Sequence, residues 1–384
     1  MPPPVYLDYN ATTPVDEQVL AEMLPWFGEH FGNPSSRRHA YGWMADEAVN
    51  KAREQIAELL GAEPAGVTFT GSATEALNLA IKGVAQARKS HGRHLVTVST
   101  EHNAVLGAHE ALEREGFEIT RLPVDASGLV ESGDVAQALR SDTILLSVMW
   151  ANNETGVIQP IEELYEIARR HNVIFLTDVT QAAGKVRVHA GAADLLACSA
   201  HKMYGPKGVG ALIRNPASRR LRIIPQIHGG GHEDGLRAGT LNVPGIVGMG
   251  AAAELVARCM EDDADRLSKL RDNLENRLRA VYPHTIVNGI NAPRLPQTSS
   301  IAFAGTPAER MLPLMRDVAV STGSACASGS GRISHVLQAM GLSDELARST
   351  MRLSLGRSTT QEEVDRAVSS ITKALQSLGA AQIA

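Results

Sequence analysis

The sequence predicts an α/β fold built on a mostly parallel sheet, followed by a smaller α+β domain. Six short apolar runs rich in β-branched residues alternate with helical patterns through the first two thirds of the chain. This order is typical of parallel sheets whose strands are connected by helices. After about residue 245, helical patterns surround shorter candidate strands such as residues 299–303. The candidate strands of the first part are residues 67–70, 95–99, 144–149, 173–177, 195–199 and 209–213.

The composition describes a globular chain and argues against several other classes. The 384 residues are 43% hydrophobic and 21% charged, with a net charge of −5, and can form one large core or two smaller ones. No block of like charge stands out, so nucleic acid is not an expected partner. The most apolar stretch, residues 245–257, is shorter than the roughly 20 residues that a membrane span requires. Three cysteines and an N-terminus without a secretory pattern predict a cytoplasmic location.

The spacing of apolar and capping residues predicts two helices. Residues 161–168 carry apolar side chains at helical spacing just before the candidate strand 173–177, as a connection between parallel strands requires. Near the C-terminus, Thr360 and Glu363 have the spacing of a capping box, and Gly379 marks the end of the helix. We expect both helices to have structural roles.

Charged side chains follow two of the candidate strands. Asp178 comes directly after strand 173–177, and Lys202 follows strand 195–199. In open α/β sheets the carboxyl ends of the strands face the ligand crevice. An amine and a carboxylate there suit pyridoxal phosphate, because a lysine forms a Schiff base with its aldehyde and a carboxylate keeps its ring nitrogen protonated. Each residue also has a structural alternative, since strand-end aspartates often form turns and most lysines are solvated.

A candidate phosphate site follows the first strand of this sheet. Gly71 permits a tight turn after strand 67–70, and a helical pattern begins just beyond it. The N-terminus of a helix offers backbone N–H groups to an anion. Ser72 and Glu75 have equally the spacing of an ordinary capping box.

Two further polar segments follow strands. His102, after strand 95–99, could stack on a flat heteroaromatic ring or be a surface histidine. Asn152 and Asn153, after strand 144–149, could deliver polar side chains to the same sheet edge or form a turn.

Cys326 lies in a run of small residues at 321–331. Such a run has little side-chain surface to hold it against a core, so we expect a mobile loop. A thiol on such a loop, when ionised, can attack a sulfur atom in one place and present the product elsewhere. The alternative is a flexible loop with an incidental cysteine. Cys198 and Cys259 are expected to be inert core residues.

Eight motifs, in chain order, together resemble the cysteine desulfurases of the NifS/IscS-like class. The resemblance covers nearly the whole chain, and the combination is specific although the shorter motifs alone are not. The motifs are YLDYNATTP at 6–14, GNPSS at 32–36, ATE at 73–75, TEH at 100–102, NNE at 152–154, SAHK at 199–202, HGGGHE at 228–233 and GSAC at 323–326.

The resemblance implies the aminotransferase-like fold type I of pyridoxal phosphate enzymes, in a homodimer with its active sites at the subunit boundary. It implies an N-terminal segment, residues 1–15, that packs with the small domain. A large cofactor-binding domain would span residues 16–250. A small C-terminal domain would span residues 251–384 and carry the mobile cysteine loop 321–331.

The resemblance also implies a role for each matching residue. Lys202 would form the Schiff base, Asp178 would pair with the ring nitrogen, and His102 would stack on the ring and move protons. Arg352 would bind the substrate carboxylate, a task that suits a guanidinium group. The other implied contacts are Asn153 and Gln181 near the phenolic oxygen, with Asn153 also at the substrate, Ala73, Thr74, Ser199 and His201 at the phosphate, and Thr240 from the other subunit. No metal site is implied.

The implied activity is the removal of sulfur from L-cysteine. The products would be L-alanine and a persulfide on Cys326, which is passed to a sulfur-acceptor protein such as an iron–sulfur scaffold. A selenocysteine lyase or an aminotransferase on the same fold is the first alternative, and the cysteine loop argues against the aminotransferase. A non-catalytic dimeric sulfur carrier is the second, but it would be expected to lose Lys202, Asp178 or Arg352. Residues 329–335 depart from the family pattern, and the short C-terminus leaves the acceptor unidentified.

Overall fold

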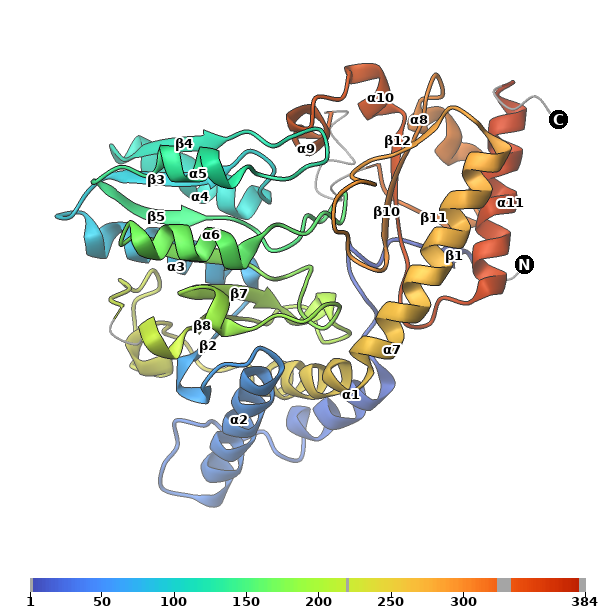
Figure 1. The fold of residues 1–384 in the computed structure, drawn as a ribbon. Helices are drawn as coiled ribbons and strands as arrows, with labels where there is room; N and C mark the ends of the chain where they lie inside the picture. The colour runs from blue at the N-terminus through green and yellow to red at the C-terminus, as the bar shows by residue number, and fades with distance from the viewer. Residues whose placement is uncertain (1–2, 219–220, 323–332, 380–384) are drawn as a thin grey trace.

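The computed structural model describes residues 3–218, 221–322 and 333–379, and its largest layer is a twisted sheet (Figure 1). Within the described residues this sheet has seven strands in the order β2-β8-β7-β6-β5-β3-β4. The strands from β4 to β7 pair in parallel, whereas β8 is antiparallel to both of its neighbours. The bounds are β2 (Val67–Thr70), β3 (His94–Val98), β4 (Glu118–Leu122), β5 (Thr143–Ser147), β6 (Ile174–Asp178), β7 (Leu195–Ser199) and β8 (Gly210–Arg214).

The mostly parallel sheet is confirmed, and each candidate strand of the first part overlaps a strand of the structure. The sequence analysis missed β4. This strand lies at the edge of the sheet, where Glu118 and Arg121 are exposed. An edge strand with polar side chains lacks the apolar run that marks the buried strands.

Helices cover both faces of the sheet and form two cores. Successive residues of the strands alternate between these cores, as Leu145 and Leu146 of β5 do, because strand side chains point to opposite faces. Helices α3 (Ala73–Arg88) and α4 (Asn103–Arg114) contribute to one core. The other core takes side chains from α2 (Ala40–Leu59), α5 (Ser132–Ala138), α6 (Ile161–Arg170) and the first half of α7 (Val243–Val281).

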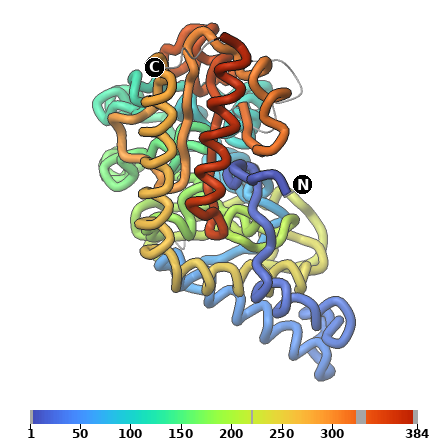
Figure 2. The backbone as a smooth tube through the Cα atoms, turned by 90° about the vertical axis from the view of Figure 1, so that its right-hand side faces the viewer, coloured from blue at the N-terminus to red at the C-terminus, as the bar shows by residue number. Residues whose placement is uncertain are grey.

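A second, smaller sheet lies beside the first (Figure 1). Strand β10 (Thr298–Phe303) pairs antiparallel with β12 (Thr350–Ser354) and β9 (Thr285–Val287). The second half of α7 and the C-terminal helix α11 (Gln361–Ser377) run side by side over it and share its core (Figure 2). The N-terminal strand β1 (Val5–Tyr6) pairs in parallel with β11 (Val318–Ala319). The remaining α-helices of the described chain are α1 (Glu17–Met23), α8 (Ala308–Met311), α9 (His335–Ala339) and α10 (Asp344–Arg348).

Helix α7 is much longer than the apolar stretch at 245–257 suggested. It has 39 residues, because the acidic segment after Met260 continues as an amphipathic helix whose Leu270 and Leu274 are buried. By length and composition alone α7 would qualify as a membrane span, yet 56% of its most apolar window is buried inside the protein, as in a core helix. Since α7 contributes both to a core of the large sheet and to the core of the smaller sheet, the domain boundary near residue 250 remains a prediction.

Both helices that the sequence analysis singled out, α6 and α11, are present in the structure. The capping box of α11 is confirmed, because Thr360 and Glu363 each accept a hydrogen bond from the other's backbone N–H. Gly379 then takes a φ of 70°, the left-handed region that favours glycine after a helix. Helix α6 is confirmed just before β6.

Candidate active site

A cavity of about 250 Å³ lies at the carboxyl ends of β6 and β7. Among the described residues, every predicted site residue except Thr240 lines it. Thr240 is exposed in the single chain, and Cys326 lies outside the described residues. The lining consists of Asn10, Ala11, Ser72, Ala73, Thr74, Leu77, His102, Met149, Ala151, Asn153, Asp178, Thr180, Gln181, Ser199, His201, Lys202 and Arg352.

Asp178 is the last residue of β6 and is buried, with 8% of its surface exposed. One carboxylate oxygen, Oδ1, accepts a hydrogen bond of 2.9 Å from the backbone N–H of Thr180. This bond fixes the direction of the carboxylate at the floor of the cavity. Thr180 also lines the cavity, and the sequence analysis had not singled it out.

His102 is the N-cap residue of α4, a role that the sequence analysis missed. Its Nδ1 accepts a 3.1 Å hydrogen bond from the backbone N–H of Ala104, so the ring proton of the neutral imidazole lies on Nε2. Burial lowers the pKa of His102, Asp178 raises it, and Lys202 and His335 lower it further. The site therefore contains a neutral imidazole whose remaining N–H donor is Nε2.

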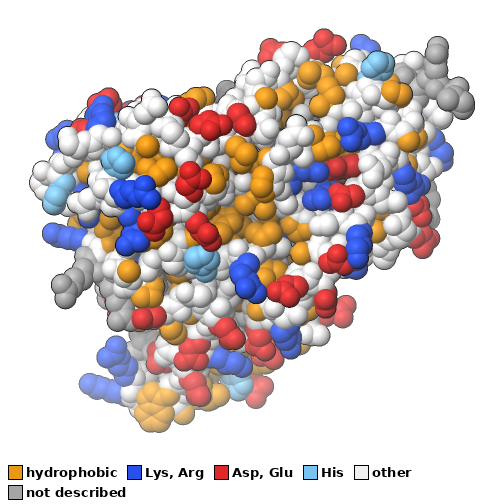
Figure 3. Space-filling model, in the orientation of Figure 1, with side chains coloured by type: hydrophobic (Ala, Val, Ile, Leu, Met, Phe, Trp, Pro, Cys, Tyr) orange, Lys and Arg blue, Asp and Glu red, His pale blue; other side chains and the backbone are white. Residues whose placement is uncertain are grey.

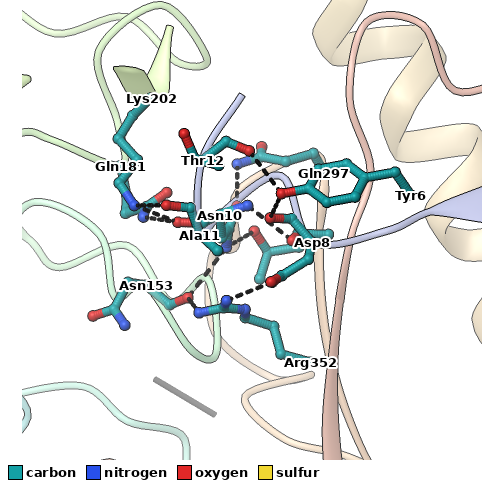
Figure 4. Close-up of polar contacts among 12 residues, drawn as sticks. Tyr6, Asp8, Asn10, Ala11, Thr12, Asn153, Gln181, Lys202, Gln297 and Arg352 are labelled. Atoms are coloured by element: carbon teal, nitrogen blue, oxygen red, sulfur yellow. Dashed lines mark hydrogen bonds and ion pairs between the residues drawn. The ribbon is translucent and has the colours of Figure 1, made fainter. Parts of the chain in front are cut away.

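Lys202 reaches from the short 3₁₀ turn after β7 to the N-terminal segment (Figure 4). Its Nζ donates to the backbone carbonyl oxygens of Asn10 at 2.7 Å and Ala11 at 2.6 Å. The Asn10 carbonyl also accepts a 3.0 Å hydrogen bond from Nε2 of Gln181, and the Asn10 side chain donates to the carbonyl of Asn153 at 3.2 Å. Asn10 thus connects residues from three distant parts of the chain at one wall of the cavity.

Arg352 is contributed by β12 of the smaller sheet and is only 2% exposed. Its Nη2 pairs with Oδ1 of Asp8 at 2.7 Å, and its Nη1 donates to the carbonyl oxygen of Asn153 at 3.0 Å (Figure 4). Its buried Nε has no hydrogen-bond partner among the described residues. A guanidinium group has five N–H donors, so Arg352 retains donors for an anionic ligand while Asp8 holds it in place.

The start of α3 forms another wall of the cavity. Ser72 caps the helix by accepting from the N–H of Glu75. The reciprocal half of the predicted capping box is wrong, because the Glu75 carboxylate instead accepts from the N–H of Gly71 at 2.7 Å and pairs with Arg237 at 2.9 Å. The first turn of the helix, which includes Ala73, faces the cavity. Backbone N–H groups and the helix dipole favour an anion at this point.

The neighbouring strand β8 approaches the start of α3 closely. A Cβ atom on Gly210 would lie 2.5 Å from the backbone carbon of Ser72 and 2.8 Å from the nitrogen of Ala73. Only glycine allows this contact, which holds the helix start against the sheet. The helix start, the Lys202 amine and the Asp178 carboxylate therefore converge on one cavity, and these groups fit the phosphate, aldehyde and ring nitrogen of pyridoxal phosphate.

Both flanks of the cysteine segment are attached beside this cavity. Before the segment, Ser321 and Arg352 exchange backbone hydrogen bonds of 2.7 and 3.2 Å. After it, the hydroxyl of Ser334 donates to the Glu154 carboxylate at 2.5 Å, and Nε2 of His335 donates to the carbonyl oxygen of Glu101 at 3.0 Å. The sequence analysis assigned no function to Ser334 or His335.

The two described cysteines differ in their surroundings. Cys198 lies inside β7 and is fully buried, and burial raises the pKa of its thiol to about 12, so it is an inert core residue as expected. Cys259 is only half-buried, and its sulfur lies 3.6 Å from Nη2 of Arg357. The expectation that Cys259 is a core residue was therefore wrong.

The comparisons with known proteins agree with this geometry. A family model described as aminotransferase class-V matches residues 5–367, which places the chain among pyridoxal phosphate enzymes of this class. A protein named cysteine desulfurase IscS from Anaeromyxobacter sp. (strain Fw109-5) is 51% identical over 98% of this chain and 93% of its own. A protein with the same name from Neisseria meningitidis (strain FAM18) is 49% identical over 94% of this chain and 89% of its own length.

Solved structures show the same relationship. A structure titled NifS-like protein is 36% identical, with a TM-score of 0.90 and coverage of 97% of this chain and 99% of its own. One titled SspA in complex with cysteine is 38% identical, with a TM-score of 0.80 and coverage of 91% and 98%. The chain belongs to the cysteine desulfurases within the class-V aminotransferase family.

Proposed function

We propose that this chain removes sulfur from L-cysteine, releases L-alanine and holds the sulfur as a persulfide on Cys326. The observation that carries the proposal is the convergence of Lys202, Asp178 and Arg352 on one cavity, with both flanks of the cysteine segment attached at its rim. Cys326 is five residues from Ser321, and five residues of chain span at most about 18 Å. The thiol is therefore tethered within reach of the cavity.

Arg352 binds the carboxylate of L-cysteine through the N–H donors that Asp8 and the Asn153 carbonyl leave available, and Asn153, which lines the same cavity, also contacts the substrate. Bound pyridoxal phosphate supplies an electron-withdrawing ring that stabilises negative charge on the substrate carbon. Lys202 would hold the bound cofactor, and its amine, when not bonded to the cofactor, would accept the proton from the α-carbon of L-cysteine. His102 donates and accepts protons through Nε2, since its Nδ1 is occupied by the α4 cap.

The sulfur transfer requires the Cys326 thiolate. It attacks the substrate sulfur, so that a sulfur–sulfur bond forms and the carbon–sulfur bond of the substrate breaks. The bonding electron pair stays with the carbon, which is protonated and leaves in L-alanine. The substrate sulfur is thereby oxidised to the persulfide level while the carbon is reduced, and no external oxidant is needed.

The other cavity residues hold the cofactor. Asp178 would pair with the ring nitrogen, and His102 would stack on the ring. Gln181 and Asn153 would hold the phenolic oxygen. The start of α3 and polar side chains across the cavity would bind the phosphate, namely Ala73, Thr74, Ser199 and His201, with Thr240 contributed by a second subunit.

We place this second subunit on an exposed apolar projection formed by α1, the following 3₁₀ helix and the start of α2. The projection extends from the body of the molecule (Figure 1), and hydrophobic side chains gather at its tip (Figure 3). Phe27 is 64% exposed, Phe31 68% and Trp43 59%. Contiguous apolar surface of this kind marks an interaction site, and a second copy of the chain is the partner that would also bring Thr240 to the cavity.

The persulfide is passed to a sulfur-acceptor protein such as an iron–sulfur scaffold. We place the enzyme in the cytoplasm, because three cysteines cannot all pair within one chain and the thiol of Cys326 must be reduced before it can attack the substrate sulfur.

The test compares the parent with Cys326→Ala, using Cys259→Ala as the matched control. With L-cysteine as substrate, the parent and the control form L-alanine, and mass spectrometry finds one added sulfur on the peptide that contains Cys326. Cys326→Ala still changes its visible absorption when L-cysteine binds but forms no L-alanine. Full turnover by this variant would refute the role of Cys326, and a keto acid as product would indicate an aminotransferase.

A further inference from the structure

A lysine that the mechanism does not use lies next to one of the proposed cofactor ligands. Lys185 follows β6 in the chain, and its Nζ donates a 3.1 Å hydrogen bond to Oε1 of Gln181. Nε2 of Gln181 donates to the Asn10 carbonyl oxygen at 3.0 Å. Both ends of the Gln181 amide therefore have a defined partner.

The chemistry of these partners decides which way the amide points. The amide oxygen and nitrogen of glutamine have nearly the same shape, so packing alone does not distinguish the two orientations. The amine of Lys185 donates and, when protonated, cannot accept, whereas the carbonyl of Asn10 can only accept. The Gln181 oxygen must therefore face Lys185, and its N–H donors must face Asn10 and the cavity. Without Lys185 the amide oxygen loses its partner, and only the Asn10 carbonyl at the nitrogen end still holds the amide.

The position is unfavourable for an ammonium group. Burial, together with the positive charges of Lys202 and Arg352, lowers the pKa of Lys185 to about 7. The carboxylate that lines the small cavity beside Lys185, Asp263, is paired with Arg357 at 3.0 Å, and the titratable groups there include Tyr9 and Tyr204. A neutral amine keeps two N–H donors, so the hydrogen bond to Gln181 is available on both sides of this pKa.

We propose that Lys185 is a positioning residue that holds the Gln181 amide with its N–H donors toward the phenolic oxygen of the cofactor. The inference rests on the proposed role of Gln181 in cofactor binding. Lys185 acts on the cofactor only through Gln181, and this restriction makes the inference testable by a double-mutant cycle.

The cycle uses the parent, Lys185→Met, Gln181→Ala and the double variant. Each apoprotein is titrated with pyridoxal phosphate while its visible absorption is recorded. Loss of one buried hydrogen bond and of a fixed donor is expected to weaken cofactor binding about tenfold in Lys185→Met and to shift its absorption maximum. Lys185→Arg keeps a donor and is expected to stay within about threefold of the parent. In the Gln181→Ala background, Lys185→Met is expected to change the affinity less than twofold.

Three results would overturn the inference. The first is parent-like affinity and absorption in Lys185→Met, and the second is a tenfold effect that persists in the Gln181→Ala background. The third is a parent apoprotein that does not bind pyridoxal phosphate, which would overturn the proposed function as well. Thermal unfolding of each apoprotein checks the fold. If Lys185→Met does not fold, the cycle uses Lys185→Ala, which also removes the donor to the Gln181 oxygen.

Discussion

Replacing Arg352 by lysine tests the proposed substrate contact, because the change keeps the positive charge and removes the planar fork. In the structure two of the guanidinium nitrogens are committed to Asp8 and to the Asn153 carbonyl. A single ammonium group cannot keep both contacts and bind a carboxylate at two points. Loss of one charged hydrogen bond costs about 1.5–3 kcal/mol, which corresponds to an increase of about 10- to 150-fold in KM for L-cysteine.

The assay measures L-alanine formation against L-cysteine concentration for the parent and Arg352→Lys. Arg357→Lys is the control, because Arg357 pairs with Asp16 and Asp263 and does not line the active-site cavity. Cysteamine, which is cysteine without its carboxylate, provides a second comparison: its binding to the cofactor, followed by absorption, should be equal in parent and variant. A KM within twofold of the parent value, or an equal loss of affinity for cysteamine, would refute the assignment of the carboxylate to Arg352.

Three further outcomes follow from the structure. Ser334→Ala removes the hydrogen bond to Glu154 next to the cysteine segment, which is worth about 1 kcal/mol. This change should slow persulfide formation several-fold and leave the cofactor affinity unchanged. An unchanged rate of persulfide formation in stopped-flow measurements would count against a role for this contact. Burial lowers the pKa of His109 to about 4. From pH 6.5 down to about 4 the unfolded chain therefore binds a proton that the folded chain does not, and stability falls by about 3 kcal/mol. His109→Gln should reduce this loss in urea unfolding, and an identical pH profile would contradict the reasoning. Phe31→Asp should convert the proposed dimer to a monomer in light scattering, whereas a monomeric parent would exclude the proposed interface.

Local patterns predicted the elements that carry the site. The apolar runs marked the buried strands, and the carboxyl ends of parallel strands meet at one edge for any chain of this class. Asp178 and Lys202, which follow neighbouring strands of the sheet, therefore had to lie close together. The polar edge strand β4 and the long helix α7 were not predicted correctly, because neither has the uniform apolar pattern of a fully buried element.

Contacts between distant parts of the chain could not be predicted from local patterns. Glu75 has the spacing of a capping box, but it turns toward Arg237, 162 positions later. Asp8 and Arg352 are 344 positions apart, and nothing in either local sequence indicates that one holds the other. Lys185 has an ordinary local sequence, and only the burial of its amine beside Gln181 shows what it contacts.

The sequence by itself determined the alternation of buried strands and helices, the family, and which polar side chains the sheet would bring to its carboxyl edge, because these depend on periodicity and on the residue types at strand ends. Only the tertiary structure decided the tautomer of His102, the partners of Arg352 and the direction of the Gln181 amide. These depend on which donors and acceptors from remote segments lie within hydrogen-bonding distance, and the packing of the two sheets against the N-terminal segment sets those distances.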